Sequence, residues 1–127
     1  MNKYWILLAG LACGMVCAQP APVAATDEAK PASTNVFNSQ YPRIHPDLRA
    51  TFQLKAGEAQ SVQVLIGHDK YEMKKAADGL WYATTDPLVP GFHYYSFNVD
   101  GANVSDPASH TFYGTGRDAS GIEVPEK

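Results

Sequence analysis

The sequence predicts an all-β domain. Short segments with alternating apolar and polar residues follow one another along the chain, and turn-forming residues interrupt them about every 8 to 12 positions. No segment shows a helical period over more than about a turn or two. About seven short strands in a chain of 127 residues indicate an immunoglobulin-like β-sandwich, with a small barrel as the main alternative.

Residues 1–18 have the pattern of a secretory signal peptide. Lys3 supplies a positive charge, residues 4–16 are apolar or small, and Ala18 ends a run suited to cleavage. A transmembrane anchor would need about 20 apolar residues, more than this run supplies. A lipoprotein acylated at Cys17 or Cys13 is a second alternative, although the residues before each cysteine match that signal poorly. The sequence therefore predicts export to the periplasm or the extracellular space.

Residues 19–40 are predicted to form a flexible linker. Proline, alanine and small polar residues dominate this segment, and it has no period that could bury one face. The folded domain is expected over residues 41–125. Because cleavage after Ala18 would remove both cysteines, this domain would depend on its packed core and not on a disulfide.

The first half of the domain is predicted to contain an entry segment and three strands. Pro42 and Pro46 exclude a helix at the entry and favour extended backbone. In the first strand Phe52 and its alternate neighbours are assigned to the core because their period is two. The expected elements are the entry segment 41–46, the turns 56–59 and 67–70, and the strands 48–55, 61–66 and 70–74.

The fourth strand is expected over residues 80–85. Its alternation places Trp81 and Ala83 on one side and Tyr82 and Thr84 on the other. The following segment, 86–91, contains two prolines, so we expect it to be a corner at which the chain crosses between sheets.

A long strand over residues 92–99 follows. Tyr95, Phe97 and Val99 share one parity and are assigned to the core, which places Tyr94 on the opposite face. Asp100-Gly101 is a strong signal for a two-residue hairpin turn. The remaining expected elements are strands over 102–105 and 110–113, a glycine-rich loop over 114–121 and an edge strand over 122–124.

The residues give no signature of an enzyme or a metal site. The serines beyond residue 18 lack the Gly-x-Ser-x-Gly pattern, although a triad defined by geometry alone stays possible. The histidines lie apart, without metal-site spacing, and are predicted in turns or on the surface: they are His45, His68, His93 and His110. We therefore predict no metal, no cofactor and no catalysis by this chain alone.

The charge of the chain bears on its partners. A formal net charge of −3 with few charged residues gives no electrostatic basis for binding nucleic acid or anionic membranes. Flat aromatic side chains on a sheet can stack on sugar rings, with amides at the rim. Strand parity gives Tyr82, Tyr94 and, if the third strand is an edge, Tyr71 as candidate carbohydrate-binding residues. The candidate polar groups near them are His68, Asn98 and Asn103.

Several motifs in combination resemble a known family. Those that carry the core pattern are Gly79-x-Trp81, Pro90-Gly91-x-His93-x-Tyr95-x-Phe97-x-Val99-Asp100-Gly101 and Asp106-Pro107. They resemble the early-set immunoglobulin-like domains grouped with carbohydrate-binding module family 48. The runs 41–46, 85–95 and 121–125 further resemble the N-terminal module of secreted bacterial carbohydrate esterases of the feruloyl and acetyl-xylan type.

This resemblance implies a non-catalytic accessory module. In such esterases the module precedes an α/β-hydrolase domain, and this chain stops at Lys127, where that domain would begin. A fragment of a longer esterase and a free-standing module are both open. The implied partners are plant cell-wall polysaccharide of the xylan type and an esterase catalytic domain. The alternative is a structural spacer or protein-interaction domain without glycan binding.

The resemblance departs from the family at two positions. Glucan-binding members carry a tryptophan after the second strand and another after the Asp-Gly turn. This chain has His68-Asp69-Lys70 at the first place and Asn103 at the second. The resemblance therefore does not imply α-glucan binding, and Trp81 matches a position whose ring lies in the core.

Overall fold

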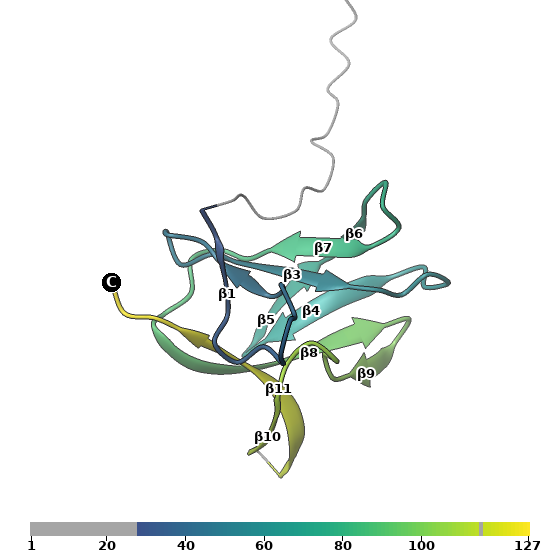
Figure 1. Cartoon of the computed structure of the whole chain (residues 1–127). Helices are drawn as coiled ribbons and strands as arrows, with labels where there is room; N and C mark the ends of the chain where they lie inside the picture. Colours follow the sequence, from purple (N-terminus) through teal and green to yellow (C-terminus); the bar gives the residue numbers. More distant parts are fainter. Residues whose placement is uncertain (1–27, 115) are drawn as a thin grey trace, which may run out of the picture.

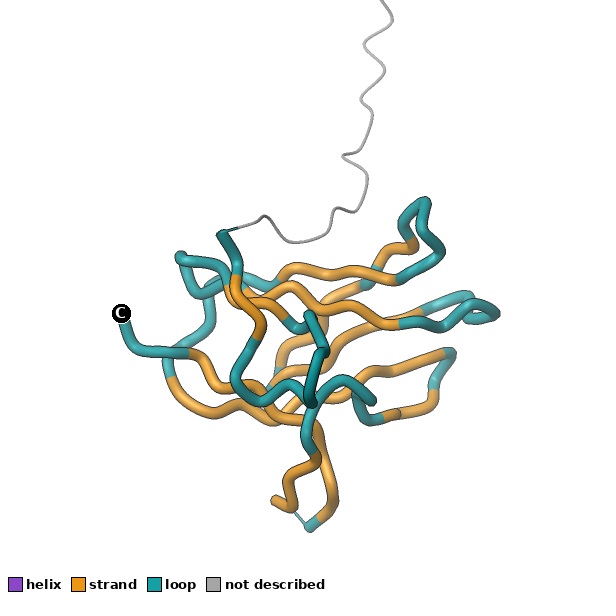
Figure 2. The backbone as a smooth tube through the Cα atoms, in the orientation of Figure 1, coloured by secondary structure: helices purple, strands orange, loops and turns teal. Residues whose placement is uncertain are grey.

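The structure is a computed structural model that describes residues 28–114 and 116–127. Within these residues the chain forms strands and loops without a helix (Figure 2). Two antiparallel sheets lie against each other in a sandwich-like arrangement (Figure 1). The all-β prediction is confirmed at this level.

The smaller sheet has five strands in the order β1-β2-β3-β7-β6. Its strands are β1 (Lys30–Pro31), β2 (Arg43–Ile44), β3 (Ala50–Leu54), β7 (Trp81–Thr84) and β6 (Lys74–Lys75). The central pair is β3 and β7, in which Phe52 lies opposite Ala83.

The larger sheet has the order β10-β11-β8-β4-β5, and β9 also pairs with β8. Its strands are β4 (Val62–Ile66), β5 (Asp69–Glu72), β8 (Gly91–Val99), β9 (Ala102–Val104), β10 (Thr111–Gly114) and β11 (Arg117–Val124). Along one of its edges, the first half of β8 pairs with β11, and this pairing ends where Tyr95 lies opposite Ser120. The second half pairs with β9, beginning where Phe97 lies opposite Val104. β8 thus changes its pairing partner near Ser96.

The core lies between the two sheets. Phe52 of β3 has its ring centroid 4.8 Å from that of Tyr95 and 6.3 Å from that of Phe97, both on β8. Val64 and Ile122 also lie on the inner face of the larger sheet, and all these side chains are buried. The parity assigned to Phe52, Tyr95 and Phe97 from the sequence is therefore confirmed.

Most of the predicted strands are present near their expected positions. The hairpin at Asp100-Gly101 is confirmed, since Val99 pairs with Ala102 and the two turn residues have φ of 49° and 93°. The corner 86–91 does join a strand of the smaller sheet to one of the larger sheet. The count differs, because the described residues contain eleven strands, of which β1, β2 and β6 have two residues each.

The glycine-rich loop predicted over residues 114–121 is wrong for most of its length. β11 begins at Arg117, and β10 ends at Gly114. The glycines at 114 and 121 lie in strands, where neighbouring aromatic rings occupy the space of a Cβ atom. In this segment Gly116 has a positive φ, of 81°, as a turn residue does.

The described part of the predicted linker, residues 28–40, packs on the sandwich. β1 pairs with β2, Ala29 and Ala32 are buried, and Arg43 donates hydrogen bonds from its guanidinium to the Ala29 carbonyl. Further along, the backbone amide of Val36 donates to the Ala108 carbonyl at 2.9 Å. Small residues without periodicity form this contact through the backbone, so the hydrophobic pattern gave no sign of it.

One histidine prediction also changes. His45 is buried, and its Nε2 atom lies 2.7 Å from the Thr51 hydroxyl oxygen, where a surface position was expected. Burial, followed by the nearby Arg49 charge, lowers the pKa of His45.

The predicted signal peptide, both cysteines and residues 19–27 of the linker lie outside the described residues. Within the part that the structure does describe, no helix is long and apolar enough to cross a membrane.

Candidate functional site

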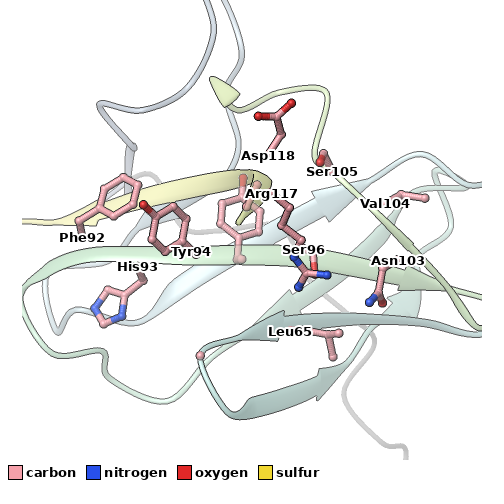
Figure 3. Close-up of a pocket in the computed structure, with 13 residues that line it drawn as sticks. Leu65, Phe92, His93, Tyr94, Ser96, Asn103, Val104, Ser105, Arg117 and Asp118 are labelled. Carbon is pink, nitrogen blue, oxygen red and sulfur yellow. The ribbon is translucent and has the colours of Figure 1, made fainter. Parts of the chain in front are cut away.

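A groove of about 520 Å³ lies on the outer face of the larger sheet, where β8 passes from β11 to β9 (Figure 3). Its lining residues are Leu65, Gly67, Phe92, His93, Tyr94, Tyr95, Ser96, Asn103, Val104, Ser105, Arg117, Asp118 and Ala119. We refer to it as the β8 groove. It combines an aromatic side with a polar side.

Strand alternation explains which side chains face the β8 groove. Tyr95 and Phe97 point into the core, so Tyr94 and Ser96 project from the opposite face of β8. Leu65 pairs with Ser96 across β4 and β8 and lies on the same outer face. The buried rings of β8 therefore fix the direction of its exposed ones.

The aromatic side consists of Phe92 and Tyr94, and Phe112 packs against Phe92 outside the lining. The ring centroid of Phe92 lies 4.9 Å from that of Tyr94 and 4.9 Å from that of Phe112, in edge-to-face geometry. A Cβ atom at Gly121 would lie 2.4 Å from Cζ of Phe92, and one at Gly114 would lie 2.0 Å from the Tyr94 hydroxyl oxygen. The two glycines thus leave the space that these rings occupy.

Gly114→Ala is expected to displace Tyr94 while leaving the fold intact, because the ring is 37% exposed and its hydroxyl end can swing away. The variant should change the near-ultraviolet circular dichroism and lose less than about 1.5 kcal/mol of unfolding free energy. Gly57→Ala is the matched control, since a Cβ atom there meets nothing within 4 Å. An unaltered tyrosine environment in Gly114→Ala would contradict this contact.

The polar side is formed by Ser96, Asn103 and Arg117. Asn98 donates from Nδ2 to the Asn103 side-chain oxygen at 3.1 Å, and its own side-chain oxygen accepts from the Gly101 amide at 3.0 Å. These bonds hold the β8–β9 hairpin and orient the Asn103 amide beside the groove.

A buried polar cluster lies behind the β8 groove. The Tyr95 hydroxyl donates to Oδ2 of Asp106 at 2.7 Å, and the Ser120 hydroxyl accepts from the Asp106 amide at 2.7 Å. Burial raises the pKa of the Asp106 carboxyl, although hydrogen bonds from Tyr95 and the Ala108 amide act in the opposite direction. Burial, together with the Asp106 charge, also raises the pKa of Tyr95. This cluster joins β8, β11 and the segment after β9.

The structure brings three of the six predicted binding residues together. Tyr94 and Asn103 line the β8 groove, and Asn98 contacts Asn103. His68 is exposed in the turn between β4 and β5, one residue after the groove-lining Gly67.

The other two predicted residues lie elsewhere. Tyr82 was expected to be exposed but is only 6% exposed, because Tyr41 packs edge-on against its ring at 5.8 Å. Its hydroxyl donates to Asp78 at 2.8 Å and accepts from Gln53 at 2.9 Å. Tyr71 lies on the edge strand β5 but is half-buried against the core. Neither ring offers a free face at the groove.

Sequence reasoning missed Phe92 and Arg117. Phe92 has the same parity as Tyr94, so the alternation of β8 could have placed it on the outer face. Arg117 fell in the segment predicted as a loop, and no local signal marks it as a strand residue. Among residues 28–114 and 116–127, no group of three potential metal ligands is close enough to hold an ion.

The comparisons with known proteins find similarity to part of one xylanase/feruloyl esterase. No family model matches the chain. An endo-1,4-beta-xylanase/feruloyl esterase of Xylanibacter ruminicola is 37% identical over 114 residues, which covers 82% of this chain. The chain spans 16% of the length of that relative. The similarity to an esterase expected from the sequence motifs is therefore confirmed, whereas the early-set and family 48 assignment stays a prediction.

Proposed function

We propose that this chain is a non-catalytic accessory module of a carbohydrate esterase, which positions xylan-type polysaccharide in the β8 groove. The observation that carries the proposal is the exposed Tyr94 ring beside the polar groups of Ser96, Asn103 and Arg117 (Figure 3). The similarity to part of a xylanase/feruloyl esterase supports this choice of ligand. The proposal includes export of the chain and an immunoglobulin-like fold of the early-set type.

The two sides of the β8 groove match the two surfaces of a sugar. The apolar face of a pyranose ring can stack on a flat aromatic side chain, and its hydroxyls need hydrogen-bond partners at the edge. Tyr94 supplies the ring, and Phe92 supports it by edge-to-face contact. Asn103 and Ser96 supply polar groups that can both donate and accept. An open groove on a sheet also suits a chain that continues at both ends.

The contacts of His93 support a non-catalytic role. Of the described residues that line the groove, His93 is the one histidine. Its Nε2 atom lies 2.6 Å from the Val89 carbonyl oxygen. A general base for Ser96 would need a ring nitrogen within hydrogen-bond reach of the serine hydroxyl. His93 and Ser96 differ by three positions in β8, so their side chains project from opposite faces of the strand. Hydrolysis of a feruloylated or acetylated substrate by the purified chain would refute this part of the proposal.

Affinity electrophoresis in gels that contain xylan, arabinoxylan or starch tests the binding. We expect the chain to be retarded in xylan, and we expect Tyr94→Ala to bind about tenfold more weakly because the stacking surface is lost. Tyr113→Ala is the matched control. Tyr113 is 77% exposed and pairs with Asp118, on the face of the β10–β11 hairpin opposite Phe112.

A spacer or protein-interaction domain is the second candidate function. Phe92 and Val104 are exposed apolar residues beside the β8 groove, and the β10–β11 hairpin projects from the sandwich (Figure 1). Such a surface could pack against an esterase catalytic domain. Unchanged mobility in all three gels would overturn the polysaccharide proposal in favour of this one.

A further inference from the structure

We propose that the β8 groove selects polysaccharide chains that carry carboxylate substituents of the uronic acid kind, and that Arg117 recognises the carboxylate. This inference rests on the proposed function, since it names the class of polysaccharide for the same groove. Net charge alone predicts no such preference, because the chain as a whole is acidic. The inference depends on the local placement of one cation.

Arg117 is placed over the β8 groove by the start of β11. It pairs with Gly114 across the β10–β11 hairpin, on the same face as Ala119 and Gly121. Its side chain extends from β11 towards Ser96 of β8 (Figure 3). The guanidinium therefore lies on the polar side of the groove, beside Ser96 (Figure 3).

This guanidinium has no partner within the described chain. Among residues 28–114 and 116–127, the one ion pair joins Nε of Arg49 to Oδ2 of Asp47 at 2.6 Å. Within these residues the Arg117 side chain makes no hydrogen bond or ion pair. An arginine presents several N–H donors in a planar fork that matches the two oxygens of a carboxylate. The unused fork leaves the groove able to accept an anionic group.

The acidic groups nearby do not cancel this charge. Of the described residues that line the groove, Asp118 alone carries a carboxylate. Its side chain points away from Arg117, because successive residues of a strand face opposite sides of the sheet (Figure 3). Glu72, at the far edge of the sheet, accepts a hydrogen bond from Gln63. Lys70 pairs with the groove residue Leu65 and adds a second positive charge on the outer face.

A single sugar unit could use both sides of the groove. With its ring on Tyr94, a carboxylate on that unit or on a side branch comes within reach of Arg117, and the remaining hydroxyls face Ser96 and Asn103. Because the net charge is −3, long-range attraction does not assist an anionic ligand. The preference should therefore come from close contact and should vanish when the fork is removed.

Calorimetric titration with a glucuronic-acid-bearing xylan, before and after chemical reduction of its carboxyl groups, tests the inference. The reduced polymer keeps the same backbone and is neutral. We expect the chain to bind the native polymer about fivefold more tightly than the reduced one. Arg117→Gln should abolish this difference while retaining affinity for the reduced polymer. Arg49→Gln, which removes an exposed arginine outside the groove, should behave as the unaltered chain.

The outcomes separate this inference from the proposed function. Equal binding of both polymers by the unaltered chain would overturn the inference and leave the polysaccharide proposal standing. A preference that persists in Arg117→Gln, or that Lys70→Gln abolishes instead, would also overturn the role of Arg117. Failure to bind either polymer would overturn both. Far-ultraviolet circular dichroism of each variant verifies that its fold is intact.

Discussion

Phe52→Ala is expected to lower the free energy of unfolding by about 3–5 kcal/mol, because it removes a fully buried ring from the centre of the core. Phe52 has no exposed surface and contacts both Tyr95 and Phe97 in the facing sheet. It thus joins the two layers of the sandwich. The lost contacts and the cavity between the sheets both contribute to the expected cost.

Urea denaturation followed by tryptophan fluorescence measures this effect. Phe37→Ala is the matched control, since Phe37 is 91% exposed and its removal should change the unfolding free energy by less than about 0.5 kcal/mol. Phe52→Leu should lose less than Phe52→Ala because it leaves a smaller cavity. Similar stabilities for Phe52→Ala and Phe37→Ala would show that the two sheets do not pack through this ring.

Within the larger sheet, β8 and β9 were well predicted because their determinants are local. In β8 the alternation of Tyr95 and Phe97 with Tyr94 and Ser96 gives both the strand and its buried face. The Asp100-Gly101 turn then sets the register of β9 through the positive φ of both residues. These two signals place Tyr94 and Asn103 of the β8 groove on one face of the sheet.

The smaller sheet was predicted less well because residues distant in sequence cover its outer face. The pattern of β7 predicted an exposed Tyr82, but Tyr41 packs on its ring and Asp78 binds its hydroxyl. In β3, Thr51 is buried because its hydroxyl contacts His45 and Thr84. When both faces of a strand are buried, alternation still separates the two faces but no longer shows that one of them is exposed.

Arg117 shows a different limit of sequence reasoning. Glycine is read as a turn residue because it adopts positive φ, and this favoured a loop over residues 114–121. At Gly114 and Gly121 the absence of a side chain matters instead, since the rings of Tyr94 and Phe92 occupy that space. The strand that carries Arg117 is therefore determined by packing with β8, which a single sequence does not reveal.

The buried carboxyl of Asp106 should make the stability of the fold depend on pH with an unusual sign. Burial raises the pKa of Asp106 in the folded state above its ordinary value of 3.8. At pH values between 3.8 and the folded-state pKa, the native state therefore holds more protons than the unfolded state. The contribution of this group is complete below 3.8 and is lost as the pH rises through the folded-state pKa. Most paired carboxylates act in the opposite sense.

Asp106→Asn isolates this contribution, because it replaces the carboxyl with a neutral amide of the same shape. We expect the unfolding free energy of the unaltered chain minus that of the variant to fall as the pH rises above 3.8, by up to about 1.4 kcal/mol per pH unit at its steepest. Urea denaturation at a series of pH values measures the difference. Asp69→Asn, which removes an exposed carboxylate from β5, is the control for loss of one charge. A difference that rises with pH would mean that hydrogen bonds from Tyr95 and Ala108 outweigh burial at Asp106.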